Sequence, residues 1–387
     1  MDSSLLLEKL PAEILDQIIG AIRNKQDLRS MRKTCRAINN LAQRWRYHDT
    51  YIDMEGFLRR LKYNDLKRFR EHLKENGHLI REVYVRGERI APACGMLNTF
   101  NVAPFLEKLP NMRKLEISGG CGSESIADTI QEYIMTRSDK KDHMYTVLER
   151  ASLLTPPRER ALQSLRSLTL NLIVGLSSDS GSDWHLDEIG FVFLIENLED
   201  LTLSRVNLGP SDPEIPLEEP LNLEQFRGRT NLRRLTITES HINLECLEKV
   251  LTFPRALTHL KLDHRKPILS DWEDEQLEDW EKKPYTPDDL HRAIGQQRFS
   301  LASLEIKGWD LGYLTKLESH LSDFPTLWEY IGWKEAPLGE LAEFPFLGEY
   351  SGWKQEPPEF KPDRRVRGQQ LGIKQKQYRG GKFYGSI

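Results

Sequence analysis

One pattern of apolar positions, apolar-x-x-apolar-x-apolar, recurs seven times between residues 80 and 306. The seven matches are Ile80/Val83/Val85, Met112/Leu115/Ile117, Leu165/Leu168/Leu170, Leu198/Leu201/Leu203, Leu232/Leu235/Ile237, Leu257/Leu260/Leu262 and Leu301/Leu304/Ile306. The central residues of successive matches are 25 to 53 residues apart. Such repetition is typical of a solenoid, in which each strand-plus-helix unit buries its apolar face only against its neighbours. We therefore predict an α/β fold with one strand per match and helices between strands, for example within residues 125–151 and 244–251.

The N-terminal 50 residues show helical periodicity instead. Pro11 and Glu13 favour the start of a helix, and Asp27 is suited to cap a second one. The apolar residues that follow recur at helical spacing, as Ile14, Leu15, Ile18, Ile19 and Ile22, and then as Leu28, Met31, Cys35, Ile38, Leu41 and Trp45. This pattern predicts a helical hairpin. We expect a short strand at residues 50–52 after it, and helices at 57–63 and 65–76, the second ended by Gly77.

A shorter repeat occupies the end of the array. The motif Phe-Pro-x-Leu-x-Glu-Tyr-x-Gly-Trp-Lys occurs at residues 324–334 and again at 344–354. We interpret the two copies as terminal, aromatic-rich repeats that close the core, with a Trp/Tyr binding surface as the alternative.

Composition narrows the class of protein. Hydrophobic residues make up 39% and charged residues 29% of the 387 residues, which predicts a folded chain with a sizeable core. No apolar run reaches the roughly 18 residues of a bilayer span, and residues 1–9 do not resemble a signal peptide. The four cysteines have wide, irregular spacing, so we expect a reduced, soluble, intracellular protein of the cytoplasm or nucleus, without membrane partners.

The net charge of −4 is a sum of unlike parts. Residues 1–89 carry an excess of six Lys and Arg, residues 360–387 an excess of seven, and the segment between them therefore carries −17. Three insertions at residues 177–188, 211–220 and 271–289 supply −15 of that charge. They are interpreted as solvated loops, or alternatively as loops that steer a basic partner. The tail is expected to be disordered and solubilising, with nuclear import or weak nucleic-acid contact as the alternative.

Candidate chemistry is sparse. Gly119–Gly122 lacks the third glycine of a dinucleotide loop, and no catalytic elbow or paired catalytic signature occurs. His259, Asp263 and His264 form the nearest cluster of metal-ligand types, without a metal-binding spacing. The sequence therefore predicts no catalytic site, no metal and no cofactor.

A binding surface can be argued from strand alternation. Residues between the apolar positions of a strand point to its opposite face, which we expect to be the concave face of the solenoid. The candidate substrate-binding residues on it are Thr169, Asn171, Thr202, Ser204, Thr236, Thr238, Lys261 and Asp263. Glu116, Ser167, Glu305 and Lys307 are placed on the same face. The alternative is a solvated sheet face without a partner.

Two family resemblances give these patterns a function. The string Leu10-Pro11-Ala12-Glu13-Ile14, an apolar helix, Asp27-Leu28, Cys35-Arg36 and Leu41-Ala42 resembles an F-box over residues 7 to about 47. The array resembles degenerate leucine-rich repeats over roughly residues 79–358. Further apolar positions at Leu208, Ile242 and Leu311 fit that family, whereas Val206, Ser240 and Trp309 replace its Asn/Cys ladder, which puts regular ladder geometry in doubt.

The resemblances imply four segments. These are an F-box-like domain at 1–53, a helical connector at 54–78, a repeat array with acidic insertions at 79–358, and a basic tail at 359–387. A fungal-type F-box protein with leucine-rich repeats docks on the Skp adaptor of an SCF-type cullin–RING ubiquitin ligase. By resemblance the contacts would come from Leu10, Pro11, Ile14, Ile18, Leu28 and Met31. The sequence leaves open which of these face the adaptor and which hold the hairpin together.

The expected function is that of a non-catalytic substrate receptor whose repeats capture a protein target, of basic character if the acidic insertions select it. The alternative is an adaptor-bound scaffold that does not promote degradation, and turnover of the bound partner would separate the two. An enzyme built on the solenoid is a third, weaker alternative, and nucleic acid is not expected as the main partner.

Overall fold

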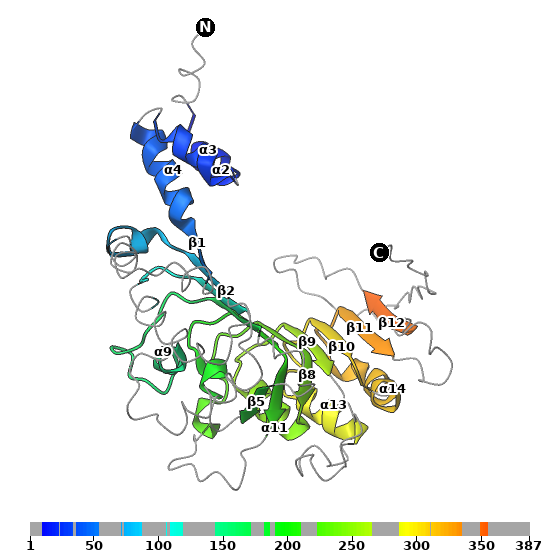
Figure 1. Cartoon of the computed structure of the whole chain (residues 1–387). Helices are drawn as coiled ribbons and strands as arrows, with labels where there is room; N and C mark the ends of the chain where they lie inside the picture. The colour runs from blue at the N-terminus through cyan, green and yellow to red at the C-terminus, as the bar shows by residue number, and fades with distance from the viewer. Residues whose placement is uncertain are drawn as a thin grey trace, which may run out of the picture. The chain divides into compact units, whose positions relative to one another are not determined.

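The computed structural model describes fourteen stretches of the chain and divides into two compact units. The described residues are 10–22, 24–33, 36–53, 71, 73–86, 106, 109–118, 144–171, 182–185, 190–209, 223–264, 286–309, 311–334 and 349–354. The first unit comprises Met1–Ala151 with Thr155–Thr169, and the second comprises Ser152–Leu154 with Leu170–Ile387. Figure 1 shows the elements of both. No helix in the described stretches is long and apolar enough to cross a membrane.

The first unit begins with three helices around a small apolar core. They are α2 (Ala12–Gly20), α3 (Lys25–Met31) and α4 (Arg36–His48). Ile19, Leu28, Ile38 and Ala42 are buried together at their centre. The indole N–H of Trp45 on α4 donates to Asp16 on α2 at 2.8 Å and so ties the two helices together.

The helical prediction is correct in kind, but two details of the second helix were wrong. The apolar stripe that predicted one helix from Asp27 is divided between α3 and α4. The cap of α3 is Asn24, whose side chain accepts a hydrogen bond from the backbone N–H of Gln26 at 2.9 Å. Asp27 lies in the first turn, where its charge suits the positive end of the helix dipole. Both residues are good caps, so the sequence alone favoured the wrong one.

The strands of the first unit are parallel neighbours. They are β1 (Asp49–Asp53), β2 (Glu82–Arg86), β3 (Lys114–Ser118) and β4 (Ser167–Asn171), with the unit boundary inside β4. The pairing aligns Thr50 with Val83 and Val83 with Leu115. The predicted strand at 50–52 is confirmed, and α4 runs directly into it. Helix 57–63 lies outside the described residues, whereas Leu73–Asn76 are helical and the 3-10 turn η1 (Gly77–Leu79) follows.

The second unit contains a longer series of strands. Its strand order is β6 (Asp200–Ser204), β8 (Arg234–Ile242), β9 (His259–His264), β10 (Ser303–Lys307), β11 (Glu329–Lys334) and β12 (Glu349–Lys354). The series is parallel from β6 to β11 and closed by the antiparallel β12. A small side sheet joins β5 (Ser182–His185) and β7 (Val206–Gly209) to the end of β8. The helical elements are η3 (Gly190–Leu194), η4 (Glu224–Phe226), α11 (Leu244–Thr252), α13 (Pro287–Gly295), α14 (Leu311–Ser319) and η6 (Leu321–Asp323), and the first unit has α9 (Met144–Ala151).

The apolar pattern marks the core. All 21 residues of the seven matches are buried, and none exceeds 8% exposure. Each match has its last two positions on a strand, and the residues between them are partly exposed. Burying an aliphatic side chain of this size contributes about 1.5–3 kcal/mol, so these residues dominate the stability of the strands. The predicted helices at 125–151 and 244–251 are confirmed over α9 and α11, while residues 125–143 lie outside the described part.

A buried serine bridges two neighbouring strands where the sequence left the geometry in doubt. The hydroxyl of Ser240 on β8 accepts the backbone N–H of Val206 on β7 at 3.1 Å and donates to the carbonyl of Thr238 at 2.7 Å. Ser240 and Val206 are both buried. The Ser240 hydroxyl therefore provides hydrogen-bond partners for the N–H of Val206 and the carbonyl of Thr238, as buried backbone groups require.

The two copies of the aromatic motif pair with each other. Tyr330 pairs with Trp353, and Trp333 with Tyr350, in an antiparallel register. The first copy forms β11, which runs parallel to β10, and its Leu327 and Tyr330 are buried. The second copy forms β12, which runs in the opposite direction. The expectation of two further repeats is therefore corrected to one repeat strand followed by an antiparallel end strand.

Candidate binding surfaces

Helix α2 is apolar on two faces. Leu15 and Ile19 are buried, whereas Ile14 and Ile18, one turn apart, are 42% and 41% exposed. Pro11 precedes them on the exposed side of the helix start. Soluble proteins expose adjacent large aliphatic residues mainly where another molecule covers them. We therefore regard Pro11, Ile14 and Ile18, here called the outer face of α2, as a candidate docking surface.

The structure separates the six residues predicted to contact an adaptor. Pro11, Ile14 and Ile18 are exposed and Leu10 is partly exposed. Leu28 is only 2% exposed inside the three-helix core, and Met31 packs against that core. Leu28 therefore stabilises the helices and is not presented to a partner. Helical periodicity could not make this distinction, because both faces of α2 are aliphatic.

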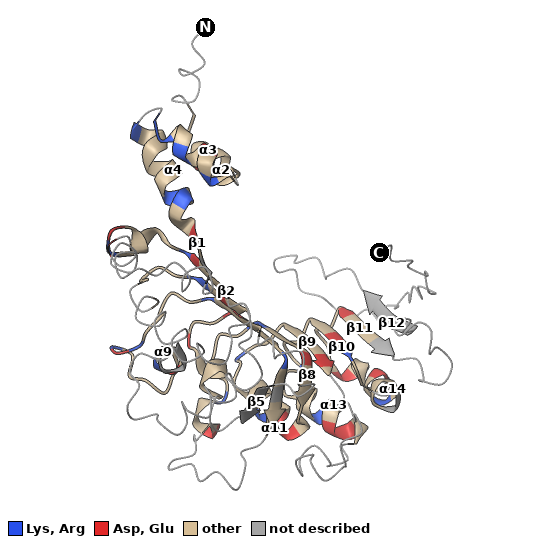
Figure 2. Ribbon diagram, in the orientation of Figure 1, with Lys and Arg blue, Asp and Glu red and all other residues tan. Residues whose placement is uncertain are grey.

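Helices α3 and α4, which pack against the inner side of α2, carry basic residues. Figure 2 shows Lys and Arg, in blue, on α3 and α4. The ammonium group of Lys25 donates to the carbonyl of Asp49 at 2.7 Å and so links the start of α3 to β1. Arg32 donates to Asn39 at 2.9 Å across the turn between α3 and α4. These contacts join α3 to β1 and to α4.

The second candidate surface is the exposed side of the second unit's strands. Thr202, Thr236, Lys261 and Glu305 stand opposite one another on β6, β8, β9 and β10. The ammonium group of Lys261 donates to Glu305 at 2.7 Å. Two further cross-strand contacts extend it: Thr238 donates to Ser204 at 3.2 Å, and Lys307 donates to Asp263 at 3.3 Å. We call these eight residues the polar strand face.

Six of the eight predicted substrate-binding residues belong to this face. They are Thr202, Ser204, Thr236, Thr238, Lys261 and Asp263, and their side chains are partly exposed as the alternation predicted. The other two, Thr169 and Asn171, are partly exposed on β4, on either side of the unit boundary. The six residues therefore lie on one surface of the paired strands β6, β8 and β9, whereas Thr169 and Asn171 are placed on β4 alone.

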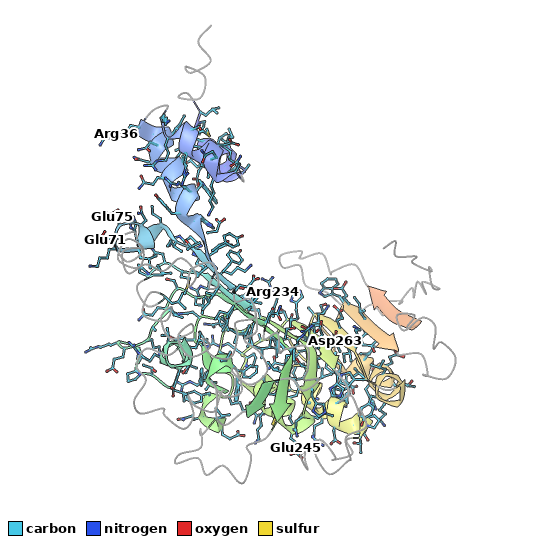
Figure 3. All side chains as sticks on the ribbon, viewed as in Figure 1. Arg36, Glu71, Glu75, Arg234, Glu245 and Asp263 are labelled. Atoms are coloured by element: carbon cyan, nitrogen blue, oxygen red, sulfur yellow. The ribbon has the colours of Figure 1, made fainter. Side chains whose placement is uncertain are left out.

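Sequence reasoning missed an ion pair at the start of the same strands. Nε and Nη2 of Arg234 each donate to one carboxylate oxygen of Asp200, which makes a bidentate pair. This contact raises the pKa of Arg234. Figure 3 shows Arg234 and Asp263 on the strands and Glu245 on the helical side of the sheet. The strand alternation could have revealed this pair. Asp200 and Arg234 lie two residues before Thr202 and Thr236, so all four side chains are expected on the same face of the sheet.

The charges of the polar strand face are already paired. On this face Lys261 pairs with Glu305 and Lys307 with Asp263, and beside it Arg234 pairs with Asp200. The side chains of the three pairs are between 18% and 61% exposed. Exposed pairs of this kind contribute only about 0–1 kcal/mol to stability. Breaking these pairs would therefore cost little folding free energy.

The sequence candidates for a metal or nucleotide site do not converge. His259 contacts Thr258 at 2.9 Å, Asp263 pairs with Lys307, and His264 accepts the backbone N–H of Ile242 at 3.3 Å. Gly119–Gly122 and the basic tail lie outside the described residues, as do most of the three acidic insertions. The described part of the third insertion includes Asp289, which caps α13 by accepting the backbone N–H of Thr286 at 2.7 Å.

A partly buried histidine is expected to make stability sensitive to acid. Burial lowers the pKa of His241 from its ordinary 6.5 to about 4, and its ring lies 5.2 Å from that of His264, which stacks on Trp309. Below pH 6.5 the unfolded chain takes up a proton that the folded chain does not, so the free energy of unfolding falls on acidification. We expect His241→Phe to reduce the loss between pH 7 and pH 5 by about 1–2 kcal/mol. Urea denaturation at both pH values measures this, and equal losses in both proteins would contradict it.

These features define a mixed α/β protein with a three-helix N-terminal segment, parallel strands and two candidate binding surfaces. No protein-family model matches the chain, and a search of curated proteins finds no match to its sequence. The function is therefore argued from the two surfaces.

Proposed function

We propose that the protein is a substrate-recognition subunit of a cullin–RING ubiquitin ligase, with an F-box-like helical segment and a leucine-rich-repeat-like array. The outer face of α2 carries this proposal. Ile14 and Ile18 are exposed on α2, whereas Ile19, on the opposite side of the helix, is buried in the three-helix core. A small helical domain does not need that second aliphatic face for its own folding, so the face is available to an adaptor.

The strand arrangement supports the second half of the proposal. Parallel strands separated by 25 to 53 residues, each with the same buried positions and covered by helices such as α11, α13 and α14, have the organisation expected of leucine-rich repeats. Ser240 fills the ladder position with a hydrogen-bonding side chain. In such an array the exposed strand residues form the binding surface, here the polar strand face.

The two surfaces fit one mechanism. The outer face of α2 would hold the chain on the Skp adaptor, and the polar strand face would hold a protein target. Tethering both to one assembly raises the effective concentration of the target near the ubiquitin-transfer machinery without any catalytic residue in this chain.

The adaptor contact gives a direct test. We expect Leu10→Asp with Ile14→Asp to abolish co-purification with the Skp adaptor, because two carboxylates would have to be desolvated in an apolar interface. The control is Gln17→Asp, a charge added at an exposed position of the same helix, which should retain adaptor binding. Far-UV circular dichroism must show unchanged helix content in both. Undiminished co-purification of the double variant would overturn the assignment.

A further inference from the structure

Two histidines and an aspartate meet where α13 lies beside the end of α14. His291 belongs to α13, His320 follows α14, and Asp323 lies in η6. Each residue offers one ligand atom, a ring nitrogen or a carboxylate oxygen, and the three atoms lie within 4.8 Å of one another. The side chains are 26%, 37% and 48% exposed respectively, so the cluster can be reached from solvent. The residues come from two segments that no sequence motif connects, which is why the sequence predicted no metal.

The cluster is held in place by its surroundings. The two imidazole rings stack with their centroids 4.7 Å apart, and the ring of His291 meets the buried Phe324 edge-on at 6.0 Å. One carboxylate oxygen of Asp323 lies 3.4 Å from Nε2 of His291 and 3.6 Å from Nδ1 of His320. Both nitrogens therefore face the same oxygen atom.

These separations match the edges of a metal tetrahedron. Ligands bound about 2.0–2.1 Å from a tetrahedral zinc ion lie about 3.3–3.4 Å apart. The two nitrogen–oxygen distances, 3.4 and 3.6 Å, need almost no adjustment to reach that value. The two nitrogens lie at most 4.8 Å apart and would have to move closer by up to about 1.4 Å to reach that value.

We propose that His291, His320 and Asp323 bind a divalent transition-metal ion, zinc in the first place. Imidazole nitrogens and a carboxylate suit zinc and leave its fourth position to water or to a partner's side chain. The ion would join α13 to the segment after α14, two successive helices of the array. A bound ion satisfies all three groups together. This inference does not depend on the proposed function.

Zinc binding to the full chain tests the site. Isothermal titration with zinc chloride is expected to show a site that His320→Ala and Asp323→Asn weaken by at least about 100-fold, since loss of even an outer-shell group costs 10–100-fold. Saturating zinc should raise the melting temperature of the wild type by about 5 °C and leave those of the two variants unchanged. Asp323→Asn preserves the size of the side chain, so it keeps the test valid if His320→Ala folds poorly.

The matched control is His78→Ala, which removes an exposed histidine from the first unit. It should bind zinc as the wild type does. Wild-type affinity in both His320→Ala and Asp323→Asn would overturn the proposal, as would an absence of zinc uptake by the wild type. Restored binding in Asp323→His, which supplies a third imidazole, would strengthen it.

Discussion

Gly308→Ala is expected to lower the free energy of unfolding by about 3 kcal/mol or more. Gly308 follows β10 with φ +81°, a left-handed conformation that costs a non-glycine residue about 1–3 kcal/mol. An added Cβ would also lie 1.7 Å from the carbonyl oxygen of His264, which ends β9. That neighbour is backbone, so relief requires the ends of two paired strands to separate. Urea denaturation of the variant and wild type measures the loss.

The matched control separates strain from collision. Gly228 also has a left-handed conformation, with φ +64°, but an added Cβ there meets nothing within 4 Å. Gly228→Ala should therefore lose only about 1 kcal/mol, from backbone strain alone. Equal losses at both positions would mean that the approach of Gly308 to His264 does not limit packing between β9 and β10.

The repeating part of the fold was predictable because it is local and periodic. Each match, such as Leu257/Leu260/Leu262, predicts from six consecutive residues which side chains are buried. In all seven matches the last two positions lie on a strand and all three residues are buried. The direction of the final strand was not predictable in this way. Its motif is nearly a copy of the preceding one, and only the pairing of Tyr330 with Trp353 shows that the chain reverses.

The candidate sites were harder to predict because they depend on which face a residue occupies. The alternation along β6 to β10 placed Thr202 and Lys261 on the exposed side correctly. On α2, Ile18 and Ile19 are chemically identical, and only the packing of Ile19 against Leu28 and Ala42 distinguishes them. His291 and Asp323 become neighbours through helix packing, which leaves no trace in the spacing of either residue.

Ile19→Asp is expected to unfold the three-helix core whereas Ile18→Asp is expected to leave it folded, although the two are the same change at adjacent positions. Ile19 is 0% exposed at the centre of the three-helix core, and a carboxylate there lacks a hydrogen-bonding partner. We expect it to destabilise that core by about 4 kcal/mol or more and to release the contact of Trp45 with Asp16. Ile18 is 41% exposed, so Ile18→Asp should change stability by no more than about 0.5 kcal/mol.

The pair also decides how adaptor binding can be interpreted. The proposed function implies that both variants lose binding to the Skp adaptor, but that only Ile18→Asp does so with normal helix content and normal resistance of residues 12–48 to proteolysis. Loss of binding by a folded Ile18→Asp variant identifies the outer face of α2 as the contact, whereas loss by Ile19→Asp reports unfolding. If Ile19→Asp remains as protease-resistant as Ile18→Asp, the three helices do not pack around Ile19. The division of α2 into an inner and an outer face would then be wrong.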